Sequence, residues 1–294
     1  MKGWSGMLTL IVNPTAGNGF AKKIIDQLHT ELEKSGVAFK FVYTEYPGHA
    51  TELAKAAAND AGCHCVVSVG GDGTAYEVAC GLIGTKVAMG IIPAGTGNDF
   101  IKTVGIPKQH LDALNFILNG KARPVDVGSM NERMFLNVCG TGFDVTALDY
   151  TQDAKKYCRG ILPYLIGLVR GIFHYAPVHV KFTFDGVEQE RDVLMCGVCN
   201  GRFFGGGFPI CPASSPDDGF LDLVVVDNVP RWKIPFYIPG ILMGKVLGFK
   251  ITRHYRCKSV KFEAAGMRLD VDGEIIPMES AEFTVQPGKL MLYW

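Results

Sequence analysis

Apolar and polar positions alternate with two different periods along the first 125 residues. Short apolar runs of strand length lie at 7–12, 37–43, 65–69 and 87–92. Between them, apolar residues recur at helical spacing at 20–35, 49–59 and 74–82. Strands that are apolar throughout and alternate with helices are typical of a parallel sheet covered by helices. We therefore expect an α/β domain with a mainly parallel sheet at the N-terminus.

The pattern changes after about Pro124, where strand-like runs follow one another. They lie at 133–138, 179–184, 193–199, 221–226, 259–263, 267–271 and 282–285. Asp185-Gly186 and Asp272-Gly273 are hairpin-type turns. Helical patterns at 161–175 and 238–247 interrupt the series. This half predicts an antiparallel β-sandwich-like domain or open barrel.

The two patterns divide the chain into an α/β domain at 1–126 and a β-rich domain at 127–285. The tail at 286–294 is expected to pack back on the first domain. No flexible linker separates the halves, so we expect them to pack around a cleft. Neither an internal repeat nor a low-complexity segment is visible in the sequence.

Composition narrows the class of protein. The chain has 29 Lys and Arg against 29 Asp and Glu, and this zero balance argues against a nucleic-acid partner. The most apolar segment, 232–249, is interrupted by charges and prolines, so no membrane span is expected. Nine cysteines in no framework spacing, after an N-terminus unlike a signal peptide, predict reduced thiols in a cytoplasmic protein.

Two cysteine pairs raise the question of a metal site. Cys63 and Cys65 lie in one strand-like run, and Cys196 and Cys199 lie in another. A zinc site needs convergent pairs, whereas residues three apart on a strand point to opposite faces. We therefore interpret these cysteines as buried structural thiols.

Glycine is the compositional exception: 36 of 294 residues are Gly, where roughly 7% is usual. Many of them cluster in three turns that each follow a predicted strand and precede a helix. The turns read NPTAGNG at 13–19, GGDGT at 70–74 and IPAGTGNDF at 92–100. Because parallel strands end at one edge of a sheet, the three turns should lie together, where helix N-termini suit a phosphate.

Asp72 lies inside the second turn and would repel a phosphate unless a cation lay between them, which suggests Mg²⁺. An Asp that merely caps a tight turn is the alternative interpretation. The turns do not match the P-loop pattern GxxxxGK[ST], and no GxGxxG follows the first strand. A P-loop NTPase and a standard dinucleotide fold are therefore disfavoured.

The three turns in this order resemble the diacylglycerol kinase catalytic domain, and the whole chain is similar to the bacterial soluble lipid kinases of that family. The second half continues the resemblance with LNVCGTGFD at 136–144, GGG at 205–207, DDGFLD at 217–222 and DVDGE at 270–274. GGDGT alone is shared with NAD kinases and, in similar form, with phosphofructokinases. The GTGND turn and the DDGxLD segment narrow the resemblance to the diacylglycerol kinase family.

The resemblance implies ATP and Mg²⁺ as cofactors, with the nucleotide in the inter-domain cleft. The positions that match family nucleotide contacts are Asn13, Pro14, Thr15, Ala16, Gly17, Thr44, Gly70, Gly71, Asp72, Gly73, Thr74, Ala75, Tyr76 and Thr96. Asp72 and Asp99 would belong to the catalytic magnesium and phosphate network, together with Asp126 at the domain junction. Glu274 matches the position of the proton acceptor, although an ordinary acid after a turn is the alternative.

The family also holds a structural Mg²⁺ in the DDG loop. Here the ligands would be the Asp218 carboxylate and main-chain oxygens near Ser215 and Phe220. The sequence departs from the family at Tyr76, where many members have Asn, and at Ala16, where Ser is usual. Neither change removes a charge, so activity is still expected.

The expected function is transfer of the ATP γ-phosphate to a lipid hydroxyl, most simply that of diacylglycerol. An NAD kinase and a non-catalytic nucleotide-binding protein are the alternatives. The apolar pattern at 161–175, edged by Arg159, Arg170 and His174, would suit peripheral contact with a membrane. A core helix packed on the β-domain is the competing interpretation. The identity of the lipid and a homodimer stay open.

Overall fold

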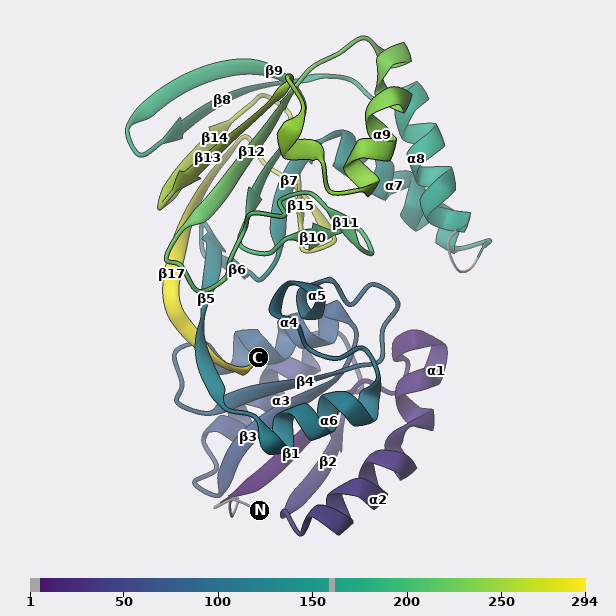
Figure 1. Ribbon diagram of the computed structural model, residues 1–294, viewed down its shortest axis with the longest axis vertical. Helices are drawn as coiled ribbons and strands as arrows, with labels where there is room; N and C mark the ends of the chain where they lie inside the picture. Colours follow the sequence, from purple (N-terminus) through teal and green to yellow (C-terminus); the bar gives the residue numbers. More distant parts are fainter. Residues whose placement is uncertain (1–5, 159–161) are drawn as a thin grey trace. The chain divides into compact units, whose positions relative to one another are not determined.

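The computed structural model describes residues 6–158 and 162–294 (Figure 1). Arg159 and the first residue of the helix expected at 161–175 lie outside the described residues. The chain forms two compact units. Unit 1 comprises the chain up to Val127 together with Pro287–Trp294, and unit 2 comprises Gly128–Gln286.

Unit 1 is built on a parallel sheet. The strand order is β4 (Ala88–Pro93), β3 (Cys63–Gly70), β1 (Met7–Val12) and β2 (Phe39–Tyr43). The end of the last strand, β17 (Ser280–Tyr293), adds parallel to β4, with Leu292 opposite Met89. Every residue of β4 is buried, and β1 and β3 are almost entirely so, which explains their continuous apolar sequence.

Helices cover both faces of this sheet (Figure 1). They are α1 (Ala16–Lys23), α2 (Ile25–Ser35), α3 (His49–Ala58), α4 (Asp72–Leu82), α5 (Asp99–Val104) and α6 (His110–Asn119). The helix expected at 20–35 is divided in two at Ile24. Leu28 and Leu32 bury one face of α2, and Gly36 ends that helix in the left-handed conformation.

Unit 2 is an antiparallel structure, as expected. Its strands are β6 (Arg133–Phe135), β7 (Val138–Gly142), β8 (Val178–Phe184), β9 (Val187–Cys199), β10 (Phe203–Phe204), β11 (Phe208–Pro209), β12 (Leu221–Asp227), β13 (Thr252–Cys257), β14 (Ser259–Glu263), β15 (Arg268–Val271) and β16 (Glu274–Pro277). The long strands β5 (Ala122–Met130) and β17 run through both units. Asp185-Gly186 and Asp272-Gly273 both have positive φ at the two turn positions, which confirms the predicted hairpins.

Side chains on opposite faces of the unit 2 strands form two apolar clusters. Phe182, Phe262 and Phe283 belong to the first cluster, which fills the space between the strands. Val224 and Val226 belong to the second, which packs against helices. The helices are α7 (Phe143–Lys155), α8 (Leu162–His174) and α9 (Ile234–Leu242), with short 3₁₀ turns η1 (Arg231–Lys233) and η2 (Val246–Gly248).

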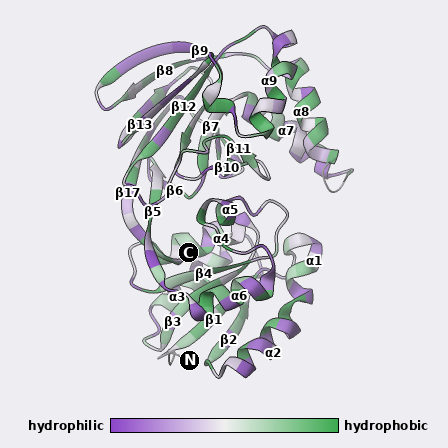
Figure 2. Ribbon diagram, in the orientation of Figure 1, coloured by the Kyte–Doolittle hydropathy of each residue, from purple (hydrophilic) through white to green (hydrophobic). Residues whose placement is uncertain are grey.

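The helical part of unit 2 differs from the sequence-based expectation in two ways. The bounds predicted for a helix at 238–247 were wrong: α9 begins at Ile234 and ends at Leu242. Helix α7 was missed: its apolar positions are interrupted by acidic and hydroxyl residues, so the helical period is weak. Figure 2 shows the contrast with α8 and α9, which are largely hydrophobic. Within the described residues, no helix is long and apolar enough to cross a membrane.

Candidate functional site

The three glycine turns of unit 1 pack against one another backbone to backbone. They follow β1, β3 and β4, which are parallel neighbours, so the turns emerge at the same edge of the sheet. A Cβ placed on Gly17 would lie 2.1 Å from the carbonyl oxygen of Ala94, and one on Gly95 would lie 2.4 Å from the Cα of Gly71. Only glycine permits such contacts, so much of the glycine pattern reflects this close packing.

Side chains tie the same turns together. The Asn13 side-chain amide donates to Thr74 Oγ1 over 3.1 Å, which joins the first turn to the second. The carboxylate of Asp72 accepts the backbone N–H of Asp99 at 2.6 Å and that of Phe100 at 3.2 Å, which joins the second turn to the third. Asp72 therefore holds the start of α5 in place, in addition to any role toward a ligand.

The turns surround a pocket of about 420 Å³. Its lining contains residues from all three turns and from the end of β2. The predicted contacts among them are Asn13, Pro14, Thr15, Ala16, Gly17, Thr44, Gly71, Gly73 and Thr74; from the third turn, Gly95 lines the pocket in place of the expected Thr96. The start of α4 opens on this pocket, and helix N-termini offer unpaired backbone N–H groups that suit phosphate.

Four lining residues were missed by the sequence analysis: Glu45, Tyr46, Pro47 and Glu77. The first three follow β2, which also ends at this edge of the sheet, so the argument that found the other turns could have found this one. The Glu77 carboxylate accepts the backbone N–H groups of Gly48 and Ala50 at 2.9 and 3.1 Å. Glu77 thereby orders the segment that carries Tyr46 and Pro47.

The remaining predicted residues of unit 1, including Asp72 and Asp99, lie outside the lining of this pocket. Gly70 ends β3, Ala75 is buried in α4, and Tyr76 is half-buried there. Thr96 is exposed in the third turn. Asp126 is buried and accepts the backbone N–H of Gly288 at 2.8 Å, which ties the two chain segments that leave unit 1.

The electrostatics of the turns suit a divalent cation. Burial raises the pKa of Asp72, and the nearby charge of Asp99 raises that pKa further. Asp99 is buried, and its carboxylate pairs with Lys102 at 2.8 Å. The charge of Asp99 acts on the Asp72 carboxylate, and a hard cation with oxygen ligands would relieve that repulsion. The residues present therefore fit Mg²⁺.

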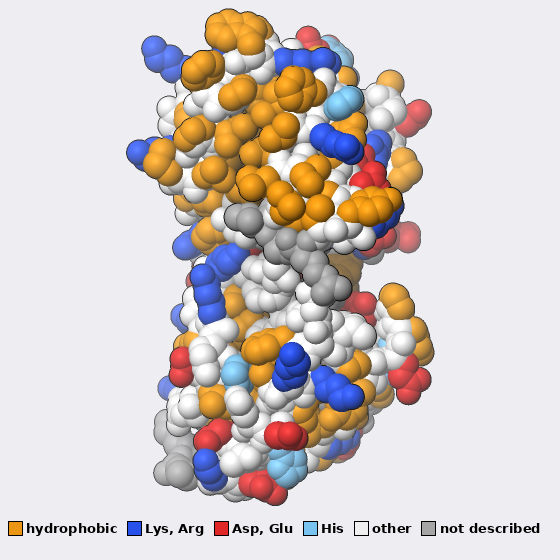
Figure 3. All heavy atoms as spheres, turned by 90° about the vertical axis from the view of Figure 1, so that its right-hand side faces the viewer, with side chains coloured by type: hydrophobic (Ala, Val, Ile, Leu, Met, Phe, Trp, Pro, Cys, Tyr) orange, Lys and Arg blue, Asp and Glu red, His pale blue; other side chains and the backbone are white. Residues whose placement is uncertain are grey.

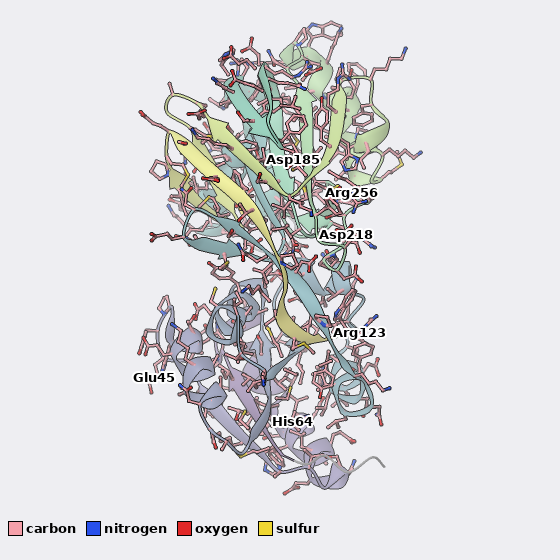
Figure 4. The ribbon with its side chains drawn as sticks, turned by 90° about the vertical axis from the view of Figure 1, so that its left-hand side faces the viewer. Glu45, His64, Arg123, Asp185, Asp218 and Arg256 are labelled. Carbon is pink, nitrogen blue, oxygen red and sulfur yellow. The ribbon has the colours of Figure 1, made fainter. Side chains whose placement is uncertain are left out.

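The DDG loop of unit 2 is held by its own contacts. Asp218 pairs with Arg256 at 2.6 Å; both residues are labelled in Figure 4. Asp218 also accepts the backbone N–H of Phe220 at 3.0 Å. Ser215 donates to Asp217 at 2.6 Å. A guanidinium thus already neutralises the carboxylate that was expected to hold a structural magnesium ion. These residues do not require Mg²⁺, and that site stays a prediction.

Glu274 begins β16 with an exposed side chain that is paired with Arg133. The turn before it is rigid: Asp272 accepts backbone N–H groups from Leu136, Asn137 and Val138. Asp270 accepts the Gly273 N–H at 2.7 Å. An exposed carboxylate on a well-fixed turn is available to accept a proton, in keeping with the role that the resemblance implies.

A second, apolar pocket lies within unit 2 and was not foreseen. Side chains from α7, α8, α9 and the β10–β11 hairpin line it, among them Phe143, Leu148, Tyr164, Leu168, Phe204, Phe208, Ile238 and Ile241. Two carboxyl groups, Asp144 and Asp270, also line it. Burial raises the pKa of Asp144 to about 7. Burial and, after it, the charge of Asp144 raise the pKa of Asp270 to about 8. The pocket therefore combines hydrocarbon walls with two carboxyl groups whose pKa values lie close to neutral pH.

The helices that line this pocket also present large apolar side chains to solvent. We call this surface the apolar face; it comprises Leu162, Leu165, Val169 and Phe173 of α8, and Trp232, Phe236, Leu242 and Met243 of η1, α9 and the following residue. Figure 3 shows hydrophobic side chains gathered there with basic residues at the margins. Arg170, Arg231 and Lys233 are exposed on the same elements.

Helix α8 has features of both expected interpretations, a helix packed within the domain and a helix with an apolar surface suited to a membrane. Its small residues pack closely on α7: a Cβ on Gly167 would lie 2.0 Å from Thr151 Oγ1, and one on Gly171 would lie 3.2 Å from Phe143. Ile172 packs against the second apolar cluster, whereas other large residues remain outside, with Phe173 69% exposed. Small residues on the inner side thus let α8 approach α7 closely while several of its large apolar side chains stay in solvent.

Comparison with known proteins agrees with this architecture. Residues 7–130 match the family described as "Diacylglycerol kinase catalytic domain", and residues 137–294 match the "YegS C-terminal NAD kinase beta sandwich-like domain". A Bacillus subtilis diacylglycerol kinase is 31% identical over 93% of this chain and 91% of its own. A Pseudomonas aeruginosa protein named as a YegS-like lipid kinase is 35% identical over 79% of this chain and 77% of its own.

Among solved structures, a Bacillus anthracis protein assigned as a diacylglycerol kinase superposes with a TM-score of 0.75 at 26% identity. The match covers 100% of this chain and 98% of that one. Fold, turns and relatives together define a phosphotransferase that uses ATP and acts on a lipid. The chain belongs to the diacylglycerol kinase family, among the bacterial diacylglycerol kinases and YegS-like lipid kinases. The expected kinase activity is thereby confirmed, and the NAD kinase and non-catalytic alternatives fall away.

Proposed function

We propose that this lipid kinase phosphorylates diacylglycerol to phosphatidate with Mg²⁺–ATP. The observation that carries the choice of lipid is the apolar pocket of unit 2 with its two carboxyl groups. The pKa values of Asp144 and Asp270 are raised to about 7 and about 8, so their protonated forms are accessible at neutral pH and can donate hydrogen bonds to the uncharged oxygen atoms of a glycerolipid. A sphingoid base instead carries an ammonium group, which pairs best with ionised carboxylates. The pocket chemistry favours the uncharged alcohol.

Each functional residue then has a proposed part. The turns at 13–19, 70–74 and 92–100 bind the phosphates of ATP through backbone N–H groups. Asp72 and Asp99 hold Mg²⁺, which would neutralise phosphate charge during transfer. Glu274 accepts the proton of the lipid hydroxyl, and Arg133 orients its carboxylate.

We further propose that the apolar face docks peripherally on an anionic bilayer. Exposed Trp, Phe and Leu side chains can enter the interfacial region, while Arg170, Arg231 and Lys233 meet anionic headgroups. Tyr164, Leu168 and Leu242 line the apolar pocket from the same two helices, so a docked enzyme could receive a lipid without releasing it into water. The cytoplasmic location and a homodimer stay predictions.

A lipid panel tests the proposed substrate. Radiolabelled γ-phosphate transfer is measured with diacylglycerol, a sphingoid base, phosphatidylglycerol and a polyprenol, each in the same mixed micelles. Diacylglycerol should be the preferred acceptor. Preferred phosphorylation of the sphingoid base would refute the argument from neutral carboxyl groups, while leaving the lipid kinase class intact.

Vesicle sedimentation tests the docking surface. The wild-type protein should sediment with phosphatidylglycerol-containing vesicles and far less with phosphatidylcholine alone. Phe173→Ser combined with Phe236→Ser removes two of the most exposed apolar side chains and should weaken this binding. Val187→Ser is the matched control, because Val187 is an exposed apolar residue at the start of β9 and not part of the apolar face. Equal loss in both proteins would exclude the apolar face as the docking site.

A further inference from the structure

A cluster of sulfur, nitrogen and oxygen ligands lies in unit 2 and has no part in the proposed reaction. Cys211 Sγ, a carboxylate oxygen of Asp222 and a ring nitrogen of His254 all lie within 4.8 Å of one another. His254 Nε2 is 2.6 Å from Asp222 Oδ1, and the side chains of Cys211 and His254 are hydrogen-bonded. Three different ligand types thus converge on one point.

Sheet register explains why these side chains meet. Asp222 on β12 is paired with Cys199 on β9 and with Arg256 on β13. His254 is two residues from Arg256 on β13, so it projects from the same face as Asp222 and Cys199. Cys211 approaches this face from the loop after β11, where its N–H donates to the carbonyl of Arg202. Three adjacent strands and a fixed loop therefore position the cluster.

Cys199 extends the cluster to four groups. Its side chain is hydrogen-bonded to that of Cys211, and both thiols are fully buried. Cys211 is also hydrogen-bonded to His254, so its side chain links the second sulfur atom to the rest of the cluster. By contrast, Cys196 belongs to the apolar cluster on the opposite face. The expected pair Cys196 and Cys199 does not converge, but Cys199 and Cys211 do.

We propose that Cys211, His254 and Asp222, with Cys199 as the fourth ligand, form a binding site for Zn²⁺. Thiolate, imidazole and carboxylate in a four-ligand set suit zinc, whereas Mg²⁺ takes oxygen ligands alone. Binding displaces the proton shared by Cys211 and His254 and also the thiol proton of Cys199, and leaves two thiolates, a neutral imidazole and a carboxylate on the metal. The two thiolates balance the two positive charges of the ion, and the carboxylate gives the site one net negative charge.

Burial at the cluster supports a bound ion and also leaves a route of entry. The side chain of Asp222 is 2% exposed, so its charge depends on close partners rather than on water. His254 is 27% exposed and forms the solvent side of the cluster. Four protein ligands, two of them buried sulfur atoms, are typical of a structural zinc site, whereas a catalytic site has three protein ligands and a water molecule.

Cobalt titration of the full chain tests the proposal directly. The reduced protein is stripped with a chelator and titrated with Co²⁺, which reports sulfur ligands through charge-transfer bands and tetrahedral geometry through intense visible bands. One equivalent should bind and give both signals, and Zn²⁺ should displace it. Cys211→Ser and His254→Asn should each weaken Co²⁺ binding by roughly 10–100-fold. Cys199→Ser should reduce the intensity of the charge-transfer bands by about half.

Matched controls keep the result interpretable. Cys80→Ser changes a partly buried cysteine of unit 1, and His179→Asn changes an exposed histidine paired with Asp192; both should leave Co²⁺ binding unchanged. A folded wild-type protein that binds no Co²⁺, or binds it without the sulfur signal, overturns the proposal and leaves a thiolate–imidazolium pair in its place. Unchanged affinity in Cys211→Ser overturns it equally. Neither result bears on lipid phosphorylation.

Discussion

The buried carboxyl group of Asp144 should make the stability of unit 2 depend on pH in a defined window. Burial raises its pKa from 3.8 to about 7 in the native protein. One pKa unit corresponds to about 1.4 kcal/mol, so the shift of roughly 3 units is linked to about 4 kcal/mol of unfolding free energy. The magnitude is large because the group lines an apolar pocket and one of its oxygen atoms has no hydrogen-bond partner.

The sign follows from which state binds the proton more tightly. The native state does, because its pKa is the higher one. The stabilising contribution of Asp144 is therefore complete below about pH 4, declines as the pH rises to about 7, and is constant above that. Between pH 5 and 8 the loss amounts to roughly 3 kcal/mol. Asp144→Asn cannot ionise, so this part of the decline should disappear.

Urea unfolding at pH 5 and pH 8, followed by circular dichroism, measures the difference. The wild-type protein should lose roughly 3 kcal/mol more than Asp144→Asn between the two pH values. Asp153→Asn on the same helix is the control, because Asp153 is exposed and paired with Lys156. Equal pH dependence in the wild type and Asp144→Asn would refute a neutral buried carboxyl group at this position.

Three further predictions concern the kinase machinery. Gly95→Ala should abolish ATP binding measured by calorimetry, because the added Cβ would lie 2.4 Å from a backbone atom. Gly248→Ala is the control: its Cβ would meet no neighbouring atom, so this variant should bind ATP normally. Retained ATP binding in Gly95→Ala would contradict the packing of the turns. Asp72→Asn keeps an oxygen that can accept the two backbone N–H groups, so the melting temperature should be unchanged while Mg²⁺-dependent phosphate transfer falls. Asp72→Ala should in addition lose about 1–3 kcal/mol of stability. Equal melting temperatures of the two variants would argue against a structural role of Asp72. Glu274→Gln should lower turnover by about 10²–10⁴-fold without unfolding, and Arg133→Gln by less; a fully active Glu274→Gln would exclude it as the proton acceptor.

The architecture of unit 1 was predictable because its strands and turns carry strong local signals. Apolar strands alternate with helical patterns, and the glycines of the turns mark where backbones meet. The convergence of the turns followed from the parallel arrangement alone. The pocket residue Glu77 was missed, because its place in the site depends on tertiary contacts with Gly48 and Ala50 after β2. Tyr46 was missed as well, although its position after β2 could have indicated it.

Unit 2 was less accessible to prediction, since its sites join residues that are distant in the sequence. Asp144 and Asp270 line one pocket from a helix and from a strand more than a hundred residues later. Cys211, Asp222 and His254 meet only through strand register and loop position. No spacing motif marks such groups, because tertiary packing alone brings them together.

The reaction proposed for this chain is the transfer of phosphate from ATP to diacylglycerol. The most direct test supplies Mg²⁺–ATP labelled at the γ-phosphate to the purified protein, with diacylglycerol in anionic mixed micelles or with NAD⁺ in a parallel assay. We predict labelled phosphatidate, no NADP⁺, and loss of the lipid product in Asp72→Asn. Formation of NADP⁺ without lipid phosphorylation, or undiminished phosphatidate in Asp72→Asn, would contradict the account.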